Sequence, residues 1–276
     1  DYAIDPKRSV ALVEATRTFA DNVEFEALIT LQGPGEAPIV QQVAADPRTI
    51  SLRQRWSLMR LPGPGYAPRV YHPASGGYSV RRIDFAQPLD QSLEQLWQPR
   101  FRLIKTNPNA ERSPVTRPIV FYLDRGTPEP VRSALLEGAN WWSAAFDQAG
   151  FVDAFRAELQ PANVDLMDLQ VNAITWTHRA TRGWSYGGGI IDPRSGEIIK
   201  GFVNLGSQRV RQDLLIAETL LAPFAADADP ALAAQAQAMA LARLRQLAAH
   251  EVGHALGLAH NFAASAHGNG SVMDYP

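Results

Sequence analysis

One eleven-residue segment constrains this chain more than any other. Residues 250–260 read His-Glu-Val-Gly-His-Ala-Leu-Gly-Leu-Ala-His. The alanine-rich stretch before it predicts a long helix from Ala231 to about Leu256, because alanine has the highest helix propensity. His250 and His254 are four residues apart, so a helix presents both imidazoles on one face. Two imidazoles placed in this way can share one metal ion.

The rest of this segment completes a metal site. Gly257 lets the chain leave the helix through a backbone conformation that a Cβ would penalise, and the turn brings His260 back as a third ligand. Glu251 lies about 100° around the helix from His250, beside the metal and not on it. Three protein ligands leave one coordination position for water, as a catalytic zinc requires. The pattern therefore predicts one Zn²⁺ held by His250, His254 and His260, and the adjacent carboxylate favours catalysis over a structural site.

A second motif follows shortly after the third histidine. Residues 271–275 read Ser-Val-Met-Asp-Tyr. The histidine pattern followed by a Met-turn is the metzincin signature, and the chain resembles that clan of zinc metallopeptidases. The resemblance implies that Met273 lies beneath the metal without ligating it, and that Tyr275 supplies a weak fifth-ligand contact and stabilises the oxyanion. It also implies a zinc-dependent endopeptidase in which a zinc-activated water attacks the peptide bond and Glu251 is the general base.

The resemblance extends to a narrower family. Several segments are similar to the bacterial EcxA-like zinc-dependent metalloproteases: residues 182–188, 192–198, 205–207, 260–262 and 271–276. In that family a domain of unknown role precedes the zinc domain, and members are typically exported. This implies an extracytoplasmic location: periplasmic, outer-surface or secreted. The family's zinc domain continues past the Met-turn, so we expect this chain to be a C-terminally truncated fragment. It begins at Asp1 without a signal peptide, which indicates processing or excision.

Composition limits the other classes of function. The 276 residues are 46% hydrophobic, which is enough for a sizeable core. Lys and Arg number 26 against 28 Asp and Glu, and this balance argues against a nucleic-acid partner. No apolar run reaches the ~20 residues of a membrane span. The absence of cysteine excludes thiolate chemistry. We therefore expect a protein or peptide substrate, and the sequence leaves the oligomeric state open.

The order of elements predicts an α+β fold with α/β-like character. We expect a β-rich N-terminal domain over residues 1–108, a linker over 109–117 and a metzincin-like domain over 118–276. A mixed twisted sheet should carry the long zinc-binding helix. Thr127 and Pro128 should open an earlier helix that Gly150 stops. Expected strands are 25–31, 39–43, 53–61, 78–85, 119–123, 155–159, 171–177, 189–191 and 198–205, with a further helix over 209–221.

One strand is expected to bind the substrate. In metzincins an antiparallel edge strand above the zinc helix takes an extended peptide by strand addition. The resemblance implies this role for a strand of the hairpin region, either 184–191 or 198–205. We favour the first, because glycines let a second backbone approach closely. The candidate substrate-binding residues are Gly187, Gly188, Gly189, Ile190 and Ile191.

A non-catalytic alternative remains open. The chain could be a latent or inert binding module of a larger exported protein. In the latent form residues 1–108 would cover the cleft, and Asp84, Asp90 or His72 would approach the metal. Nothing in the sequence selects one of these three.

A serine hydrolase is the minor alternative. Gly183-Trp184-Ser185-Tyr186-Gly187 fits the G-x-S-x-G nucleophile elbow, and Asp213 and His250 follow in the appropriate chain order. An elbow requires a strand before it and a helix directly after it. Here a strand is expected after the motif instead.

Overall fold

The computed structural model describes residues 2–179, 183–221, 230–268 and 270–274. The chain divides into two compact units, the first formed by residues 1–61 with 167–169 and the second by 62–166 with 170–276. The first unit therefore ends earlier than the N-terminal domain expected over 1–108. The division of the chain into domains stays a prediction.

A long antiparallel hairpin forms the first unit. Strand β4 (Asn22–Gln32) pairs with β5 (Thr49–Met59) along its whole length. Three short strands, β1 (Ala3–Ile4), β2 (Val10–Ala11) and β3 (Arg17–Thr18), also pair with β4. Both long strands were predicted, over the shorter ranges 25–31 and 53–61.

The return strand predicted at 39–43 is wrong. Helix α1 (Pro38–Val43) stands there, with Pro38 at its first turn. Proline suits that position because it lacks the N–H that a first turn leaves unbonded. Strand β5 supplies the partner that the predicted return strand would have given to β4.

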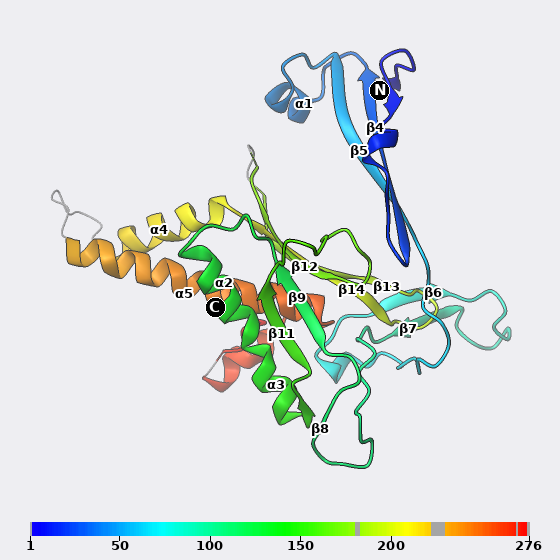
Figure 1. The fold of residues 1–276 in the computed structure, drawn as a ribbon, viewed down its shortest axis with the longest axis vertical. Coiled ribbons are helices and arrows are strands. Elements are labelled where there is room, and N and C mark those ends of the chain that lie inside the picture. Colours follow the sequence, from blue (N-terminus) through cyan, green and yellow to red (C-terminus); the bar gives the residue numbers. More distant parts are fainter. Residues whose placement is uncertain (1, 180–182, 222–229, 269, 275–276) are drawn as a thin grey trace. The chain divides into compact units, whose positions relative to one another are not determined.

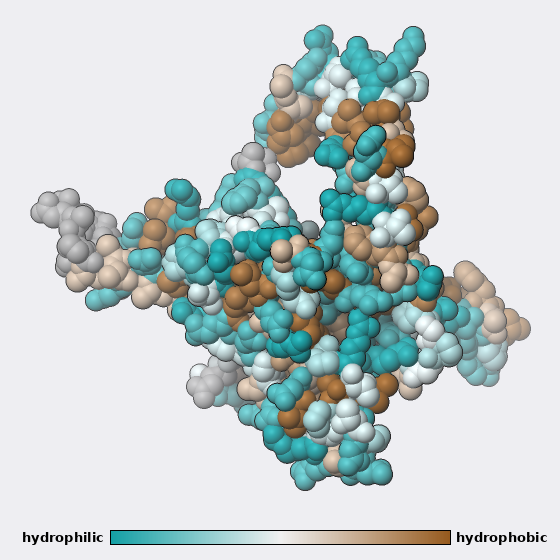
Figure 2. All heavy atoms as spheres, in the orientation of Figure 1, coloured by the Kyte–Doolittle hydropathy of each residue, from teal (hydrophilic) through white to brown (hydrophobic). Residues whose placement is uncertain are grey.

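The interior of the hairpin unit is polar. The Glu24 carboxylate is buried, accepts hydrogen bonds from Asn22 and Ser57, and pairs with Arg55 at 3.4 Å. Apolar side chains remain on the surface, with Trp56 43% and Leu58 64% exposed, and brown surface is visible on this unit in Figure 2. In the described part of this unit the buried side chains are therefore held by hydrogen bonds more than by apolar packing.

A five-stranded mixed sheet organises the second unit (Figure 1). Its order is β11 (Phe155–Leu159), β9 (Ile119–Leu123), β12 (Asn172–Thr177), β14 (Ile198–Gly206) and β13 (Tyr186–Ile191). The first four strands are parallel, and β13 runs antiparallel to β14 at the edge. The α+β fold with a mixed sheet is confirmed.

Four helices accompany this sheet: α2 (Val131–Asn140), α3 (Trp142–Gln148), α4 (Gln208–Leu221) and α5 (Pro230–Ala255). The core between sheet and helices includes Phe121, Leu135 and Val252, all fully buried. Helix α2 lies close to α5, since a Cβ on Gly138 would come within 2.0 Å of the Arg245 carbonyl oxygen. Within the described residues no helix is long and apolar enough to cross a membrane.

The start of the earlier helix was predicted wrongly. It begins at Val131, not at Pro128, and it is divided at Trp141 before Gly150 is reached. The Thr127 hydroxyl is buried and has no hydrogen-bond partner, so it caps no helix.

Residues 62–116, the first part of the second unit, contain short elements. They are 3₁₀ helix η2 (Pro73–Ser75), β6 (Val80–Ile83), β7 (Glu94–Trp97) and β8 (Ser113–Pro114). Strand β8 pairs with β10 (Phe151–Val152), so part of the segment expected to be a linker is held in place. Arg102 forms a bidentate ion pair with Glu197, at 2.8 and 2.7 Å. This pair attaches the segment to the turn between β13 and β14.

Candidate metal centre

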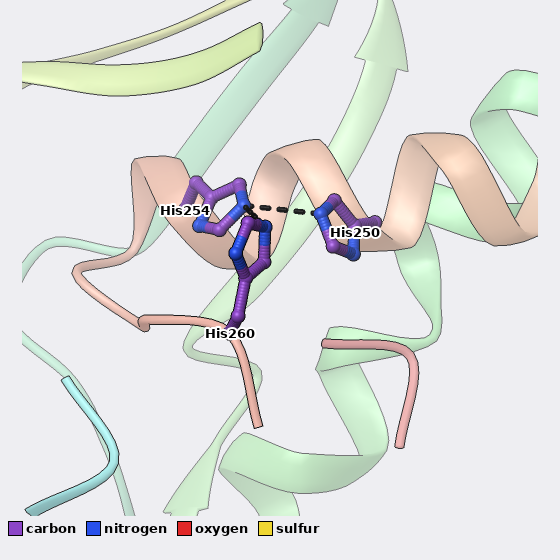
Figure 3. Close-up of side chains that lie close together, drawn as sticks. All are labelled: His250, His254 and His260. Atoms are coloured by element: carbon purple, nitrogen blue, oxygen red, sulfur yellow. Dashed lines mark hydrogen bonds between the residues drawn. The ribbon is translucent and has the colours of Figure 1, made fainter. Parts of the chain in front are cut away.

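Three histidine side chains converge at the end of α5. The Nε2 atom of His254 lies 3.0 Å from Nε2 of His250 and 3.1 Å from Nε2 of His260 (Figure 3). Nitrogens bound to one Zn²⁺ at about 2.0–2.1 Å in a tetrahedral arrangement lie roughly 3.3 Å apart. The three atoms are therefore spaced and directed as a single ion requires, and they form a group that could hold a metal.

Backbone carbonyls orient two of these imidazoles. His250 Nδ1 lies 2.7 Å from the Val272 oxygen, and His254 Nδ1 lies 2.8 Å from the Leu258 oxygen. A carbonyl oxygen only accepts hydrogen bonds, so each Nδ1 carries the proton and each Nε2 keeps its lone pair for the metal. Burial also lowers the pKa of both histidines. Neutral imidazoles are the form that binds metals.

Glu251 lies next to the first histidine in a buried position. The side chain is 6% exposed, and it accepts a hydrogen bond from the backbone N–H of Gly187 in β13. Burial raises the pKa of Glu251 to about 7. A carboxyl group with a pKa near neutrality can both take and return a proton.

The Met-turn packs against helix α5. Met273 is buried, and a Cβ on Gly253 would come within 2.2 Å of its sulfur. The neighbouring Val272 carbonyl accepts the His250 hydrogen bond, and Asn261 donates to the Met273 oxygen at 2.8 Å. The methionine is thus packed against the helical turn that carries the first two histidines. Tyr275, the other residue expected in this turn, lies outside the described residues.

Gly257 ends the helix in the left-handed region, with φ +102°. This is the conformational reason inferred from the sequence. A second reason depends on tertiary contacts, because a Cβ there would come within 2.5 Å of the Pro99 carbonyl oxygen. No pattern in the sequence relates Pro99 to this helix.

The edge strand lies against helix α5. Gly187 of β13 pairs with Val203 of β14, and a Cβ on it would fall 1.8 Å from the Glu251 carbonyl oxygen. The need for glycine at this position therefore comes from contact with α5, whereas the sequence argument attributed it to an approaching substrate. Gly188 and Gly189 face Phe202 and Ile198 of β14. Ile190 and Ile191 complete the strand across an irregularity in its pairing.

A cavity of about 340 Å³ opens beside His250 and Glu251. Its wall includes Arg209 of α4 and Arg243 of α5, which the sequence analysis did not single out. Arg209 pairs with the buried Asp213 at 3.0 Å. Each arginine is one of several charges on an amphipathic helix, so only the packing of α4 on α5 distinguishes them. The remaining lining residues are Gly183, Trp184, Ser185, Gly206, Gln208, Gln212, Gln246, Leu247 and Asp274.

The serine-hydrolase alternative does not meet its structural requirement. Ser185 lies in a loop directly before strand β13, not between a strand and a helix. Its hydroxyl accepts a hydrogen bond from the Gly206 N–H at 3.3 Å. Asp213 is ion-paired with Arg209. The elbow geometry that would expose the serine as a nucleophile is absent from this loop.

The three residues considered for latency do not join the histidine cluster in the described part of the chain. The group of close metal-ligating side chains there contains His250, His254 and His260 only. The His72 imidazole instead accepts a hydrogen bond from the Ala74 N–H. Asp84 accepts hydrogen bonds from Ala86 and Gln87 in its own turn.

The three-histidine cluster and a family-model match support a metzincin-type region at the end of the chain. Residues 233–276, which include nearly all of α5 and the Met-turn, match a family model described as Met-zincin. Residues 2–106 match a model described as a domain of unknown function (DUF5117). The chain has no significant match among curated proteins or among solved structures.

Proposed function

We propose that this chain is a zinc-dependent endopeptidase domain of the metzincin type. The observation that carries the proposal is the convergence of three imidazole Nε2 atoms beside one buried glutamate. Zn²⁺ bound there would supply Lewis acidity, which acidifies a bound water and stabilises the oxyanion. His250, His254 and His260 would hold it.

Glu251 handles the proton in this proposal. Its buried carboxylate would take a proton from the attacking water and deliver it to the leaving amine. The hydrogen bond from Gly187 fixes the carboxylate against β13. We assign Tyr275 a contribution to oxyanion stabilisation on the resemblance alone.

Strand β13 would bind the peptide. It is the last strand in the sheet order of the described residues, and it contacts the helix that carries Glu251. An extended peptide paired along Gly187–Ile191 would run past the glutamate and the histidines. A side chain next to the cleaved bond would enter the 340 Å³ cavity.

The narrower relationship and the location also belong to the proposal. The segments shared with EcxA-like metalloproteases support membership of that bacterial family. An extracytoplasmic location, in which the enzyme meets protein substrates, follows from that relationship.

Zinc stoichiometry with casein cleavage tests the proposal. Elemental analysis should find about one zinc per wild-type chain and none in His254→Ala. Glu251→Ala should retain zinc and lose casein cleavage, because it removes the proton acceptor and leaves the three ligands. Zinc binding without wild-type cleavage would favour the non-catalytic module. A wild-type chain that binds no added zinc would overturn the metallopeptidase assignment.

A further inference from the structure

The turn that carries the third histidine is held by a segment far away in the sequence. We call residues 75–78 the strap. The Ala259 N–H donates to the Gly76 oxygen at 3.0 Å, and the Tyr78 N–H donates to the Gly257 oxygen at 3.2 Å. Gly77 and Leu258 form an antiparallel bridge between these two bonds. The strap therefore pairs with the chain as it leaves α5 and approaches the third ligand.

Close packing leaves little freedom at this contact. A Cβ on Gly77 would come within 2.0 Å of Gln98 Nε2 and 2.8 Å of the Gly257 oxygen. Gln98 is buried, and its Oε1 accepts a hydrogen bond from the Ser75 hydroxyl at 2.6 Å. Pro99, the next residue, is fully buried with its carbonyl facing Gly257. Movement of the turn would require movement of both the strap and this buried pair.

His260 is held from both sides by this arrangement. The residue before it bonds to the strap, and the residue after it, Asn261, bonds to the Met273 oxygen. The first two ligands lie on a regular helix, which fixes them locally. The third ligand lies on an irregular turn, where an unsupported backbone would lose conformational entropy when the metal binds.

We propose that the strap positions His260 and thereby sets the affinity of the metal site. The strap belongs to the region that matches a domain of unknown function, so the inference assigns a role to part of that region. It rests on the proposed function, because it takes the three histidines to be zinc ligands. The strap acts through the turn that leads to His260, so its residues are positioning residues.

The test compares two glycine substitutions in the same region. Gly77→Ala forces a Cβ into the contact, whereas Gly63→Ala meets nothing within 4 Å. Zinc dissociation constants are measured by competition with a chelator, and the visible absorption of the Co²⁺-substituted protein reports the ligand geometry. We expect Gly77→Ala to weaken zinc about tenfold or more and to alter the cobalt spectrum, as loss of supporting contacts around metal ligands does. Gly63→Ala should match the wild type.

A double-mutant cycle separates positioning from general damage. In a His260→Ala background the third ligand is absent, so Gly77→Ala should cause little further loss of zinc affinity. Equal losses in both backgrounds would overturn the proposal. If Gly77→Ala does not fold, Ser75→Ala is the second variant. It removes the hydrogen bond that the hydroxyl donates to Gln98 and the one that it accepts from the Gly77 N–H, and it should weaken zinc binding in the same direction by a smaller factor. Unchanged affinity in that variant would overturn the proposal.

The two proposals fail in distinguishable ways. A wild-type chain without zinc affinity would overturn the proposed function. A wild-type chain that binds zinc, together with a folded Gly77→Ala that binds it equally well, would overturn only the role of the strap.

Discussion

At the scale of single residues, packing strongly constrains Val252 and Gly253, the two positions between Glu251 and His254. Val252 is fully buried in the core of the second unit. Gly253 lies against the sulfur of Met273 and the ring of Trp142. The histidine pattern does not specify these positions, but Gly253 is the place where the helix contacts Met273 of the Met-turn.

Substitution of Gly253 tests this packing. An alanine in a helix interior ordinarily stabilises by up to about 1 kcal/mol relative to glycine. Here the added Cβ would approach Met273 within 2.2 Å, so we expect Gly253→Ala to destabilise the metal-free protein by about 1–3 kcal/mol. Urea unfolding in EDTA measures the change. Gly206→Ala is the control, because nothing lies within 4 Å of its Cβ, and an equal loss there would refute the packing argument.

The buried glutamate predicts a pH dependence of stability. Burial raises the pKa of Glu251 from 4.5 to about 7 in the folded chain. Between these values the native state binds more protons than the unfolded state, so this carboxyl group makes the free energy of unfolding fall as pH rises. In Glu251→Gln that fall should be absent.

The measurement compares urea unfolding of metal-free wild type and Glu251→Gln at pH 5 and pH 8. From pH 5 to pH 8 the free energy of unfolding of the variant should rise relative to that of the wild type by at most about 3 kcal/mol. His250 and His254 have lowered pKa values, so they reduce the stability of the protein as pH falls. Both proteins contain these histidines, and their effect cancels in the comparison. A difference that does not vary with pH would show that Glu251 is not perturbed by burial.

At the scale of elements, the packing of α4 against α5 creates a feature that neither helix has alone. Arg209 and Arg243 meet in the wall of the cavity beside the glutamate. Asp213 neutralises Arg209, whereas Arg243 forms a hydrogen bond with the Gln246 side chain. Arg243 has no ion pair within 4 Å among the described residues, and it adds one positive charge to a lining that also holds the carboxyl groups of Glu251 and Asp274.

This charge predicts a substrate preference. Peptides with Asp or Glu next to the cleaved bond should be cleaved about two- to fivefold faster than peptides with Lys there, as for partly exposed ion pairs. Arg243→Gln should reduce this ratio in kcat/KM. Arg245→Gln is the matched control, because Arg245 pairs with Glu137 at 2.7 Å and does not line the cavity. An unchanged ratio in Arg243→Gln would exclude this cavity as the side-chain site.

Elements with strong local patterns were predicted well. The strands β4, β5, β9, β11, β12 and β14 and the helix α5 all follow from alternation, apolar runs or alanine content. The predictions were wrong where neighbouring residues favour different structures. Ile39–Val43 has strand-forming residues but follows Pro38, and Thr127 resembles a helix cap but is buried in a turn.

At the scale of the whole molecule, the site joins parts of the second unit that are distant in sequence. The edge strand β13 contributes the Gly187 contact, α5 the first two histidines, and the segment 75–99 the support of the turn. Because these parts meet at one site, binding of a metal to the native state should stabilise the fold that holds them together.

Metal removal tests this coupling. With free zinc at 100 times its dissociation constant, the native state should gain about 2.7 kcal/mol over the metal-free protein. Urea unfolding with added zinc and with EDTA measures the difference, and His254→Ala should reduce it strongly. Equal stability of the wild type under both conditions would show that zinc does not bind preferentially to the folded chain.

The convergence of His250, His254 and His260 could be inferred from sequence alone, because it depends on local geometry. Residues four apart share a helix face, and a glycine after the last turn permits the reversal toward His260. Only the tertiary structure revealed three other features: the contact of the strap with Gly257, the arginines of the cavity, and the contact of Gly187 with α5. These contacts join residues up to about 180 positions apart. Periodicity and local propensity do not predict which distant backbone segment will pack against a given residue.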